Sequence, residues 1–357
     1  MSVLSSILKE IKNPYATIAK DGLICGDIHG YVDSGSYALN ALVSGDLRGG
    51  YPKGKVTALA GEKGTGKTFL LLKAIKENLD ADHEAEVVFF ESEGALTKNM
   101  LIERGIDVDR VAIIPVSTLE DFRNQAVNTL DLLIAQWEAT DELPNVTLCL
   151  DSLGMLGSEH ELSTAKSGEN KADMGKKAQL VKSIFRLITL KLSLLQVPMI
   201  LTAHTYNGMG KYDPKKLSGG QGVELAASII VFLSKTGVRA EGKGRIKNLV
   251  GNNITFILHK GRLTIEGSKL IIGLDFKEGI KRNNGMVPLL VGGGILTKSG
   301  AWYSHGDDKN IAQGESKMYG MVDEFVNDEV LDELQPYVEK LFCYGAVENS
   351  TEEDVNE

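Results

Sequence analysis

The stretch that decides the fold is residues 55–75, which read KVTALAGEKGTGKTFLLLKAI. A glycine-rich turn at residues 61–68 lies between an apolar run typical of a buried strand and a helix with amphipathic spacing. Glycines let backbone N–H groups turn inward around phosphates, and the start of the following helix adds partial positive charge. The stretch therefore predicts a nucleotide phosphate site. The alternative is a glycine-rich turn that binds nothing.

The side chains of this turn indicate how phosphates would be held. Lys67 is expected to meet the β- and γ-phosphates of ATP, and the Thr68 hydroxyl to reach a bound Mg²⁺ ion. ATP and Mg²⁺ are therefore the expected cofactors. The predicted nucleotide contacts are Gly61, Glu62, Lys63, Gly64, Thr65, Gly66, Lys67, Thr68 and Phe69.

Carboxylates follow two further apolar strands. Asp151 ends the run at residues 146–151, and there it would hold the metal through water. Glu91 and Glu93 end the next strand after the phosphate turn, and Glu93 is the better-placed base for hydrolysis. The alternatives are a turn or helix-cap role for Asp151 and a helix N-terminal role for Glu93.

The same alternation of strand and helix continues outward from this site. Val, Ile and Leu fill the strands without a break, as in strands that are buried on both faces. We therefore expect an α/β fold with a mostly parallel central sheet flanked by helices. Strands are expected at residues 55–60, 86–91, 111–115, 146–151, 197–203 and 227–233, and helices at residues 66–79, 96–104, 119–137, 176–195 and 322–341.

Two long polar stretches, residues 158–175 and 205–222, each follow a strand. Stretches of this length without secondary structure of their own are usually functional or mobile. After about residue 279 the chain becomes glycine-rich and then helical, which predicts a small C-terminal α/β domain.

Composition limits the function less than the motifs do. The 357 residues carry a formal net charge of −9, which taken alone argues against a nucleic-acid partner. The acid is unevenly placed, however, because residues 348–357 hold five carboxylates and no base. No apolar run is long enough to cross a membrane, and the three cysteines show no metal spacing. We expect a cytoplasmic protein with reduced thiols.

Several motifs, taken in order, resemble the RecA family of recombinases, and most of all the UvsX-type branch of T-even-like phages. Glu93 stands where the family has its catalytic glutamate, and Asp151-Ser152 resembles its metal-binding strand end. His204 occupies the strand end that senses the γ-phosphate. The segments at residues 218–220 and 298–304 resemble the end of the second DNA loop and the end of the core. The similarity runs from about residue 30 to 315.

The resemblance implies an ATP-dependent recombinase that forms helical filaments on single-stranded DNA and drives strand exchange with homologous double-stranded DNA. His204 would couple the nucleotide to the second loop. Lys260 and Arg262 would reach the ATP of a neighbouring subunit as trans-acting cations. The implied DNA contacts are Lys182, Arg186, Gly219, Gly220 and Gln221.

Simpler interpretations of these residues stay open. Lys182 and Arg186 can form an ordinary solvated helix face, Lys260 and Arg262 a surface strand pair, and His204 a strand-end histidine with its hydrogen bonds satisfied.

The implied domain organisation has four parts. Residues 1–30 would pack on the next protomer, the alternative being that their apolar stripe packs on its own domain. Residues 31–279 would form the ATPase core with both DNA loops. Residues 280–345 would form the small C-terminal domain, and residues 346–357 a disordered acidic tail. The expected accessory partners are single-strand-binding and mediator proteins, in the host cytoplasm if a phage encodes the chain.

Two positions depart from the family pattern. Thr97 and Met100 stand where the family has an aspartate and a tyrosine that contact the nucleotide base, so the details of adenine recognition differ. Two rival functions also remain at this stage. One is a hexameric helicase or other ring ATPase of the same fold, and the other is a non-catalytic regulator that binds ATP and a partner recombinase.

Overall fold

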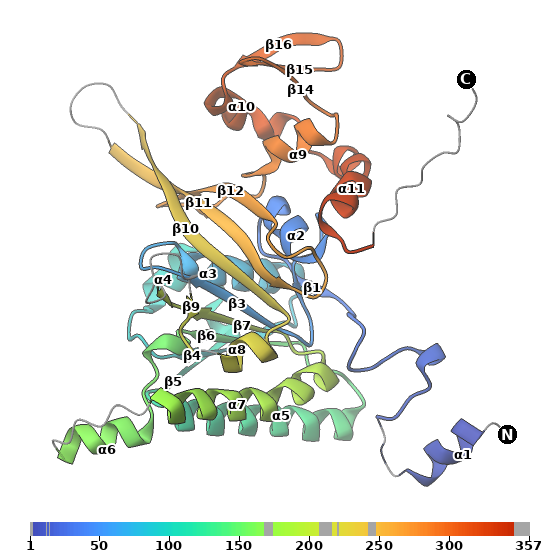
Figure 1. Cartoon of the computed structure of the whole chain (residues 1–357), viewed down its shortest axis with the longest axis vertical. Coiled ribbons are helices and arrows are strands. Elements are labelled where there is room, and N and C mark those ends of the chain that lie inside the picture. Colours follow the sequence, from blue (N-terminus) through green and yellow to red (C-terminus); the bar gives the residue numbers. More distant parts are fainter. Residues whose placement is uncertain are drawn as a thin grey trace. The chain divides into compact units, whose positions relative to one another are not determined.

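The computed structural model describes residues 3–11, 13, 15–167, 174–206, 216–219, 221–241 and 248–345 (Figure 1). The chain forms two compact units. The first comprises Met1–Ser34 and Tyr51–Ser234, and the second Gly35–Gly50 and Lys235–Glu357. The predicted boundaries after residues 30 and 279 do not coincide with this division. One reason is that helix α2 (Tyr37–Ser44) packs on strands of the second unit.

Parallel strands form the centre of the first unit, in the order β10-β3-β7-β6-β4-β5. This arrangement confirms the predicted α/β class with a mostly parallel sheet. The strands are β3 (Val56–Gly61), β4 (Glu86–Glu91), β5 (Val111–Pro115), β6 (Val146–Asp151), β7 (Met199–Ala203) and β10 (Ile229–Glu241). The helices around them are α3 (Lys67–Ala81), α4 (Lys98–Glu103), α5 (Leu119–Thr140), α6 (Glu159–Ser167), α7 (Met174–Leu195) and α8 (Gln221–Ala226).

Apolar side chains are buried on both faces of the central strands of this unit. Every residue of β3 is buried. Alternate residues Val56, Ala58 and Ala60 join one apolar cluster with α5 and α7, which lie side by side below the sheet in Figure 1. Leu59 lies between them in sequence, points to the opposite face and is also fully buried. Such two-sided burial explains why these strands are continuously apolar.

The predicted loop at residues 158–175 is wrong in its first half, because Glu159–Ser167 forms helix α6. Ser158 caps this helix by accepting a hydrogen bond from the Glu161 N–H at 3.1 Å. The Glu161 carboxylate in turn accepts from the Ser158 N–H at 2.9 Å. This reciprocal pair is a capping box, and its Ser-x-x-Glu signature was present in the sequence. Residues 168–173 lie outside the described residues.

The predicted loop at residues 205–222 also contains regular structure. Strand β8 (Thr205–Tyr206) pairs antiparallel with β9 (Lys216–Leu217), and α8 begins at Gln221. Residues 207–215 and 220 lie outside the described residues. The predicted strand at residues 227–233 is longer than expected, because β10 continues to Glu241.

The second unit contains antiparallel strands and several helices. Strand β11 (Asn248–Gly261) pairs with β12 (Lys269–Asp275), which pairs in turn with β13 (Gly279–Ile280). A three-stranded antiparallel sheet is formed by β14 (Thr297–Ser299), β15 (Trp302–His305) and β16 (Asp308–Gln313). The helices are α2, α9 (Met286–Gly292), α10 (Glu315–Met321) and α11 (Asp328–Phe342).

The helix predicted at residues 322–341 is broken. A short 3-10 turn, Val322–Glu324, precedes α11. The break falls at Asn327, whose side chain accepts a hydrogen bond from the Val330 N–H at 2.9 Å and so begins the new helix. Among the described residues, no helix is both long enough and apolar enough to cross a membrane.

Candidate active site

The phosphate turn connects β3 to α3, as the sequence predicts. Gly64 and Gly66 have φ angles of 73° and 86°, a region that side chains with a Cβ disfavour. The Thr65 hydroxyl donates to the Glu62 carbonyl at 2.9 Å and closes the turn. These features build the concave backbone that the glycine pattern predicts, at the N-terminus of a 15-residue helix.

Lys67 is buried at the mouth of this turn. Its ammonium donates to the carbonyls of Gly61 at 3.0 Å and Glu62 at 3.1 Å. Burial lowers the pKa of Lys67, while the nearby carboxylates of Asp151 and Glu93 oppose that shift. A phosphate oxygen would supply the negative charge that this desolvated cation lacks.

Asp151 lies at the end of β6 and is nearly buried. It accepts a hydrogen bond from the Thr68 hydroxyl at 2.6 Å and another from the Thr202 hydroxyl. Burial raises the pKa of Asp151, and the two hydroxyl donors oppose that rise. The short helix that follows begins at Leu153, so the structure does not use Asp151 as its cap.

Thr68 and Asp151 together offer two oxygen ligands of the kind that Mg²⁺ prefers. In the part of the chain that the structure describes, no group of three or more His, Cys, Asp or Glu side chains could hold a metal. The donor set therefore fits a magnesium ion that takes its remaining ligands from phosphate and water, and it does not fit a site made by protein side chains alone.

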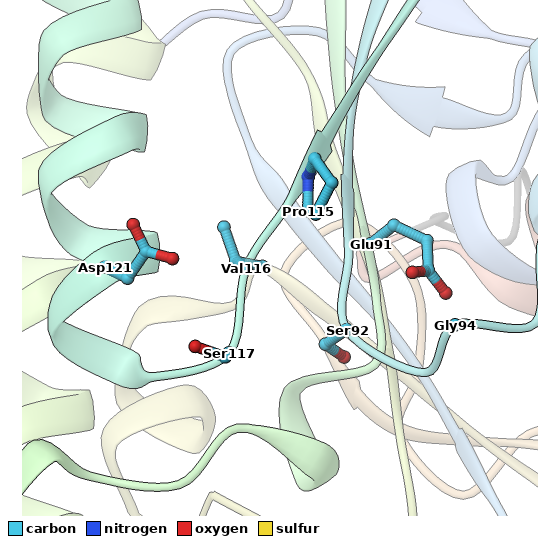
Figure 2. Close-up of a pocket in the computed structure, with 7 residues that line it drawn as sticks. All are labelled: Glu91, Ser92, Gly94, Pro115, Val116, Ser117 and Asp121. Carbon is cyan, nitrogen blue, oxygen red and sulfur yellow. The ribbon is translucent and has the colours of Figure 1, made fainter.

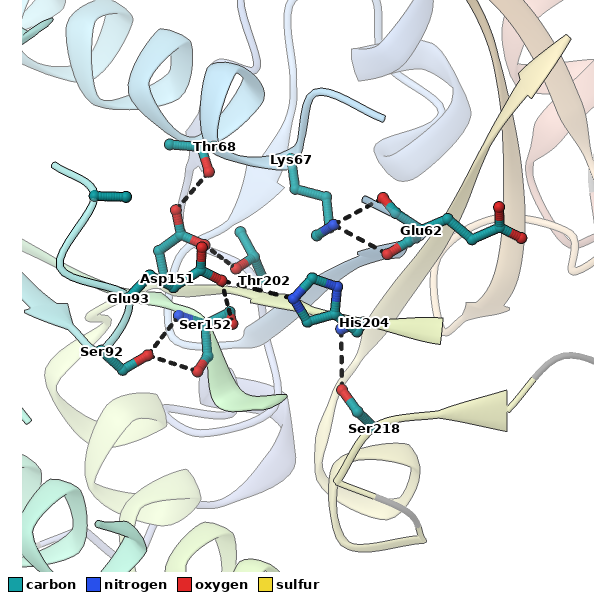
Figure 3. Close-up of polar contacts among 12 residues, drawn as sticks. Glu62, Lys67, Thr68, Ser92, Glu93, Asp151, Ser152, Thr202, His204 and Ser218 are labelled. Atoms are coloured by element: carbon teal, nitrogen blue, oxygen red, sulfur yellow. Dashed lines mark hydrogen bonds and ion pairs between the residues drawn. The ribbon is translucent and has the colours of Figure 1, made fainter. Parts of the chain in front are cut away.

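Glu93 is held in place by hydroxyl groups (Figure 3). Its carboxylate accepts from the Ser152 hydroxyl at 2.6 Å. The Ser92 hydroxyl makes two hydrogen bonds to the Ser152 backbone. It donates to the carbonyl and accepts from the N–H, both at 2.8 Å. The Glu91 carboxylate accepts from the N–H groups of Glu93 and Ala95, each at 3.1 Å, and so orders the turn.

The helix after this turn does not use Glu93 at its N-terminus. Helix α4 begins at Lys98, and its cap is Thr97, which accepts from the Met100 N–H at 3.2 Å. Glu93 therefore has the position of a site residue rather than that of a helix-dipole partner.

His204 lies between β7 and β8 and contacts both Glu93 and Ser218. Its Nε2 atom is 3.6 Å from the Glu93 carboxylate, a contact that is an ion pair only when the imidazole is protonated. On its other side, the His204 N–H donates to the Ser218 hydroxyl at 2.9 Å, and the Ser218 N–H donates to the His204 carbonyl at 2.8 Å. Figure 3 shows His204 between Glu93 and Ser218.

The sequence did not single out the hydroxyls that complete this site. The Thr202 hydroxyl donates to the Asp151 carboxylate, and the Ser152 hydroxyl donates to the Glu93 carboxylate. The Ser92 hydroxyl accepts from the Ser152 N–H, and the Ser218 hydroxyl accepts from the His204 N–H. The only available signal was position, because each of these residues lies next to or near a predicted site residue at a strand end.

A separate shallow pocket lies where β4 and β5 end (Figure 2). Its lining includes the carboxylate residues Glu91 and Asp121 and no cation. Phosphate would be repelled there, so this pocket does not compete with the turn at residues 61–68 for the phosphates of a nucleotide. Its lining residues are Glu91, Ser92, Gly94, Pro115, Val116, Ser117 and Asp121.

The structure places some of the predicted DNA contacts near one another. Lys182 and Arg186 are exposed on α7, and within the described residues neither side chain has a hydrogen-bond or ion-pair partner. A Cβ added to Gly222 would lie 2.7 Å from the Lys182 backbone nitrogen, so the second predicted loop ends directly against this part of α7. Gly219 has a φ angle of 102°. Gly220 and the Gln221 side chain lie outside the described residues.

The predicted trans-acting cations belong to the second unit. Lys260 is half-buried in β11, and Arg262 is exposed in the turn that follows. Their predicted role requires a neighbouring subunit, so it stays a prediction.

The fold and this site together define a P-loop nucleotide-binding protein. The model of the RecA N-terminal domain matches residues 6–281. The chain therefore belongs to the RecA family, whose members are DNA-dependent ATPases that carry out homologous pairing and strand exchange.

Individual relatives are distant. The recombination and repair protein of Enterobacteria phage T4 is 28% identical over 74% of this chain, and the match covers 65% of that protein. Protein RecA of Mesoplasma florum is 25% identical over 94% of this chain and 96% of its own length. Protein RecA of Mycoplasmopsis pulmonis is 29% identical, over 86% and 84%. These identities do not separate the phage branch from bacterial RecA.

Proposed function

We propose that this chain is an ATP-dependent recombinase that assembles as a helical filament on single-stranded DNA and pairs it with homologous double-stranded DNA. The observation that carries the proposal is the contact chain from Glu93 through His204 to Ser218. It connects the nucleotide site to the segment that would hold DNA. A plain nucleotide-binding protein has no need of this link.

In the proposed reaction, ATP binds with its phosphates over residues 61–68 and with Lys67 beside the β- and γ-phosphates. Thr68 and Asp151 would hold Mg²⁺, which neutralises charge on the phosphates. Glu93 orients the attacking water or accepts its proton. Ser152 supports that role because it fixes the carboxylate at 2.6 Å.

DNA would bind mainly through its phosphates. Lys182 and Arg186 are exposed and have no partner among the described residues, and residues 219–221 would supply backbone and side-chain donors. Phosphate contacts carry no sequence information, so binding is expected to be non-specific and sensitive to salt. The choice of a homologous partner then rests on base pairing within the DNA.

Neighbouring subunits complete the proposed assembly. Lys260 and Arg262 of one subunit would approach the ATP of the next, and the N-terminal residues 1–30 would pack on an adjacent protomer. Single-strand-binding and mediator proteins are the expected accessory partners. We assign the chain to the UvsX-type branch on its His204 motif, with a cytoplasmic location.

A strand-exchange assay with homologous and heterologous duplexes tests this function. We expect exchange only with the homologous duplex, only with ATP and Mg²⁺, and filaments on single-stranded DNA in electron micrographs. Closed rings without exchange would support the ring ATPase. An Asp151→Asn or Glu93→Gln protein that hydrolyses ATP as fast as the wild type would support the non-catalytic regulator.

A further inference from the structure

An arginine lies over an aromatic ring next to the phosphate turn. The Arg104 guanidinium carbon is 4.2 Å from the centre of the Phe69 ring. Phe69 directly follows Thr68 in the first turn of α3, and Arg104 is the residue that ends α4. Both side chains are half-buried. The pair therefore joins two helices at the nucleotide site.

The guanidinium of Arg104 has unused hydrogen-bonding capacity. In the described part of the chain it donates to no carboxylate or carbonyl, and its one contact is with the Phe69 ring. Arg110 is different, because it donates to the Asp107 carboxylate at 2.9 Å and to the Asp82 carbonyl at 2.9 Å. Arg110 has a structural role, while the five N–H donors of the Arg104 guanidinium have no hydrogen-bond partner among the described residues.

The packing of α4 fixes Arg104 in this position. Leu101 and Ile106, on either side of it in sequence, are buried. Gly105 has a φ angle of 69°, and a Cβ there would lie 3.3 Å from the Lys76 side chain of α3. The end of α4 is therefore held against α3, and the guanidinium is oriented before any ligand arrives.

The two ends of a bound nucleotide would meet different faces of the first turn of α3. Thr68 faces Asp151, which marks the metal and γ-phosphate end. Successive residues of a helix are rotated by about 100°, so Phe69 faces another direction. The base and ribose would lie on the Phe69 side of this turn, away from Asp151.

We propose that Phe69 and Arg104 form the platform on which the adenine base of ATP stacks, with the guanidinium plane against the base. The proposal rests on the ATP site described above and identifies its specificity-determining side chains. Planar guanidinium groups stack well on aromatic rings and nucleobases. Thr97 and Met100 offer no planar surface, and the Thr97 hydroxyl is already engaged as a helix cap.

Binding measurements on the full chain without DNA test the platform. Titration calorimetry would compare Mg²⁺-ATP with inorganic tripolyphosphate, which has the phosphates but no base. We expect Arg104→Ala to weaken ATP binding about ten-fold and to leave tripolyphosphate unchanged. Arg104→Lys should be as weak as Arg104→Ala, because it keeps the charge but loses the plane. Phe69→Leu should weaken ATP binding in the same selective way.

Arg123→Ala is the matched control, since it removes the same charge from a half-buried position on α5, where Arg123 donates to the Asn124 side chain, and should bind both ligands normally. Recovery of ATP binding by Arg104→Lys, or an equal loss of tripolyphosphate binding, would mean that Arg104 contacts phosphate, and the platform would be wrong. ATP binding by Arg104→Ala at wild-type strength would also overturn it. A Lys67→Ala protein that binds ATP normally would instead refute the ATP site itself.

Discussion

At the scale of single residues, the site is a set of charged groups held by hydroxyls. Asp151 lies between Thr68 and Thr202, and Glu93 lies against Ser152. Each hydroxyl fixes an oxygen that would otherwise rotate. Such preorganisation matters because catalytic groups must be in position before the reaction begins.

Glu93→Gln should lower the ATPase rate by about 100-fold to 1000-fold while leaving ATP binding intact, because the amide cannot accept a proton from water. Steady-state hydrolysis checks the ATPase rate, and equilibrium binding on the same preparation checks the affinity for ATP. An unchanged rate would remove Glu93 from the reaction.

Ser152→Ala should lower the ATPase rate by about ten-fold, with little change in ATP affinity, because it releases the Glu93 carboxylate without removing it. Ser117→Ala provides a control, since that serine lies near the ends of the same strands but holds no site residue in the described structure. Equal effects of both substitutions would mean that Ser152 acts only through local stability.

Asp151→Asn should raise the melting temperature of the nucleotide-free protein at neutral pH. Burial raises the pKa of the Asp151 carboxyl, so the folded protein holds this proton more tightly than the unfolded chain does. The ionised carboxylate therefore costs folding free energy once the pH exceeds the raised pKa. The difference in melting temperature between the variant and the wild type should narrow as the pH falls toward the ordinary pKa of an aspartate. Melting curves across pH test this, and a gap that widens at low pH would contradict it.

The Asp151→Asn variant should also lose the rise in melting temperature that Mg²⁺-ATP gives to the wild type, because one metal ligand has lost its charge. Melting with ATP, with and without Mg²⁺, provides the measurement. An undiminished shift with Mg²⁺ would place the metal elsewhere.

At the scale of elements, the apolar runs predicted the parallel strands well. Strands β4, β5 and β6 have the bounds that the sequence predicts, because the runs of β4 and β6 end at a carboxylate and that of β5 ends at Pro115. The strand-end rule places Asp151 and Glu93 at the carboxyl edge of the parallel strands, where ligands bind in sheets of this kind. The supporting hydroxyls escaped prediction because serine and threonine occur at many strand ends and turns, where they have no distinctive spacing.

The errors came from local capping interactions that compete with weak hydrophobic patterns. Residues 159–167 are polar and look like a loop, yet the Ser158–Glu161 capping box begins a helix there. Asn327 likewise divides one amphipathic pattern in two. Periodicity reports which face is buried, and it does not report where a helix begins.

Ser158→Ala should destabilise α6 by about 1 kcal/mol. Amide hydrogen exchange should therefore quicken by about five-fold in the first turn of α6, with no change in α7. Unchanged exchange at Glu161 and Leu162 would show that the capping box is not what forms this helix.

At the scale of the whole molecule, the N-terminal helix α1 (Val3–Glu10) carries apolar side chains that the described residues leave exposed. Val3, Leu4 and Ile7 are 75%, 58% and 45% exposed. In the proposed filament this face packs on an adjacent protomer. Leu4→Asp together with Ile7→Asp should weaken assembly on single-stranded DNA by at least about ten-fold and leave the melting temperature of the monomer unchanged. Sedimentation checks the first point and calorimetry the second, and normal filaments from the double variant would exclude this packing.

We expect DNA to complete an ATPase site that the single chain only prepares. The rate of ATP hydrolysis, measured with and without single-stranded DNA across a series of salt concentrations, tests this expectation. DNA should stimulate hydrolysis at least about ten-fold at low salt, and the stimulation should fade as salt displaces the phosphate contacts. A rate that DNA does not change at low salt would contradict it.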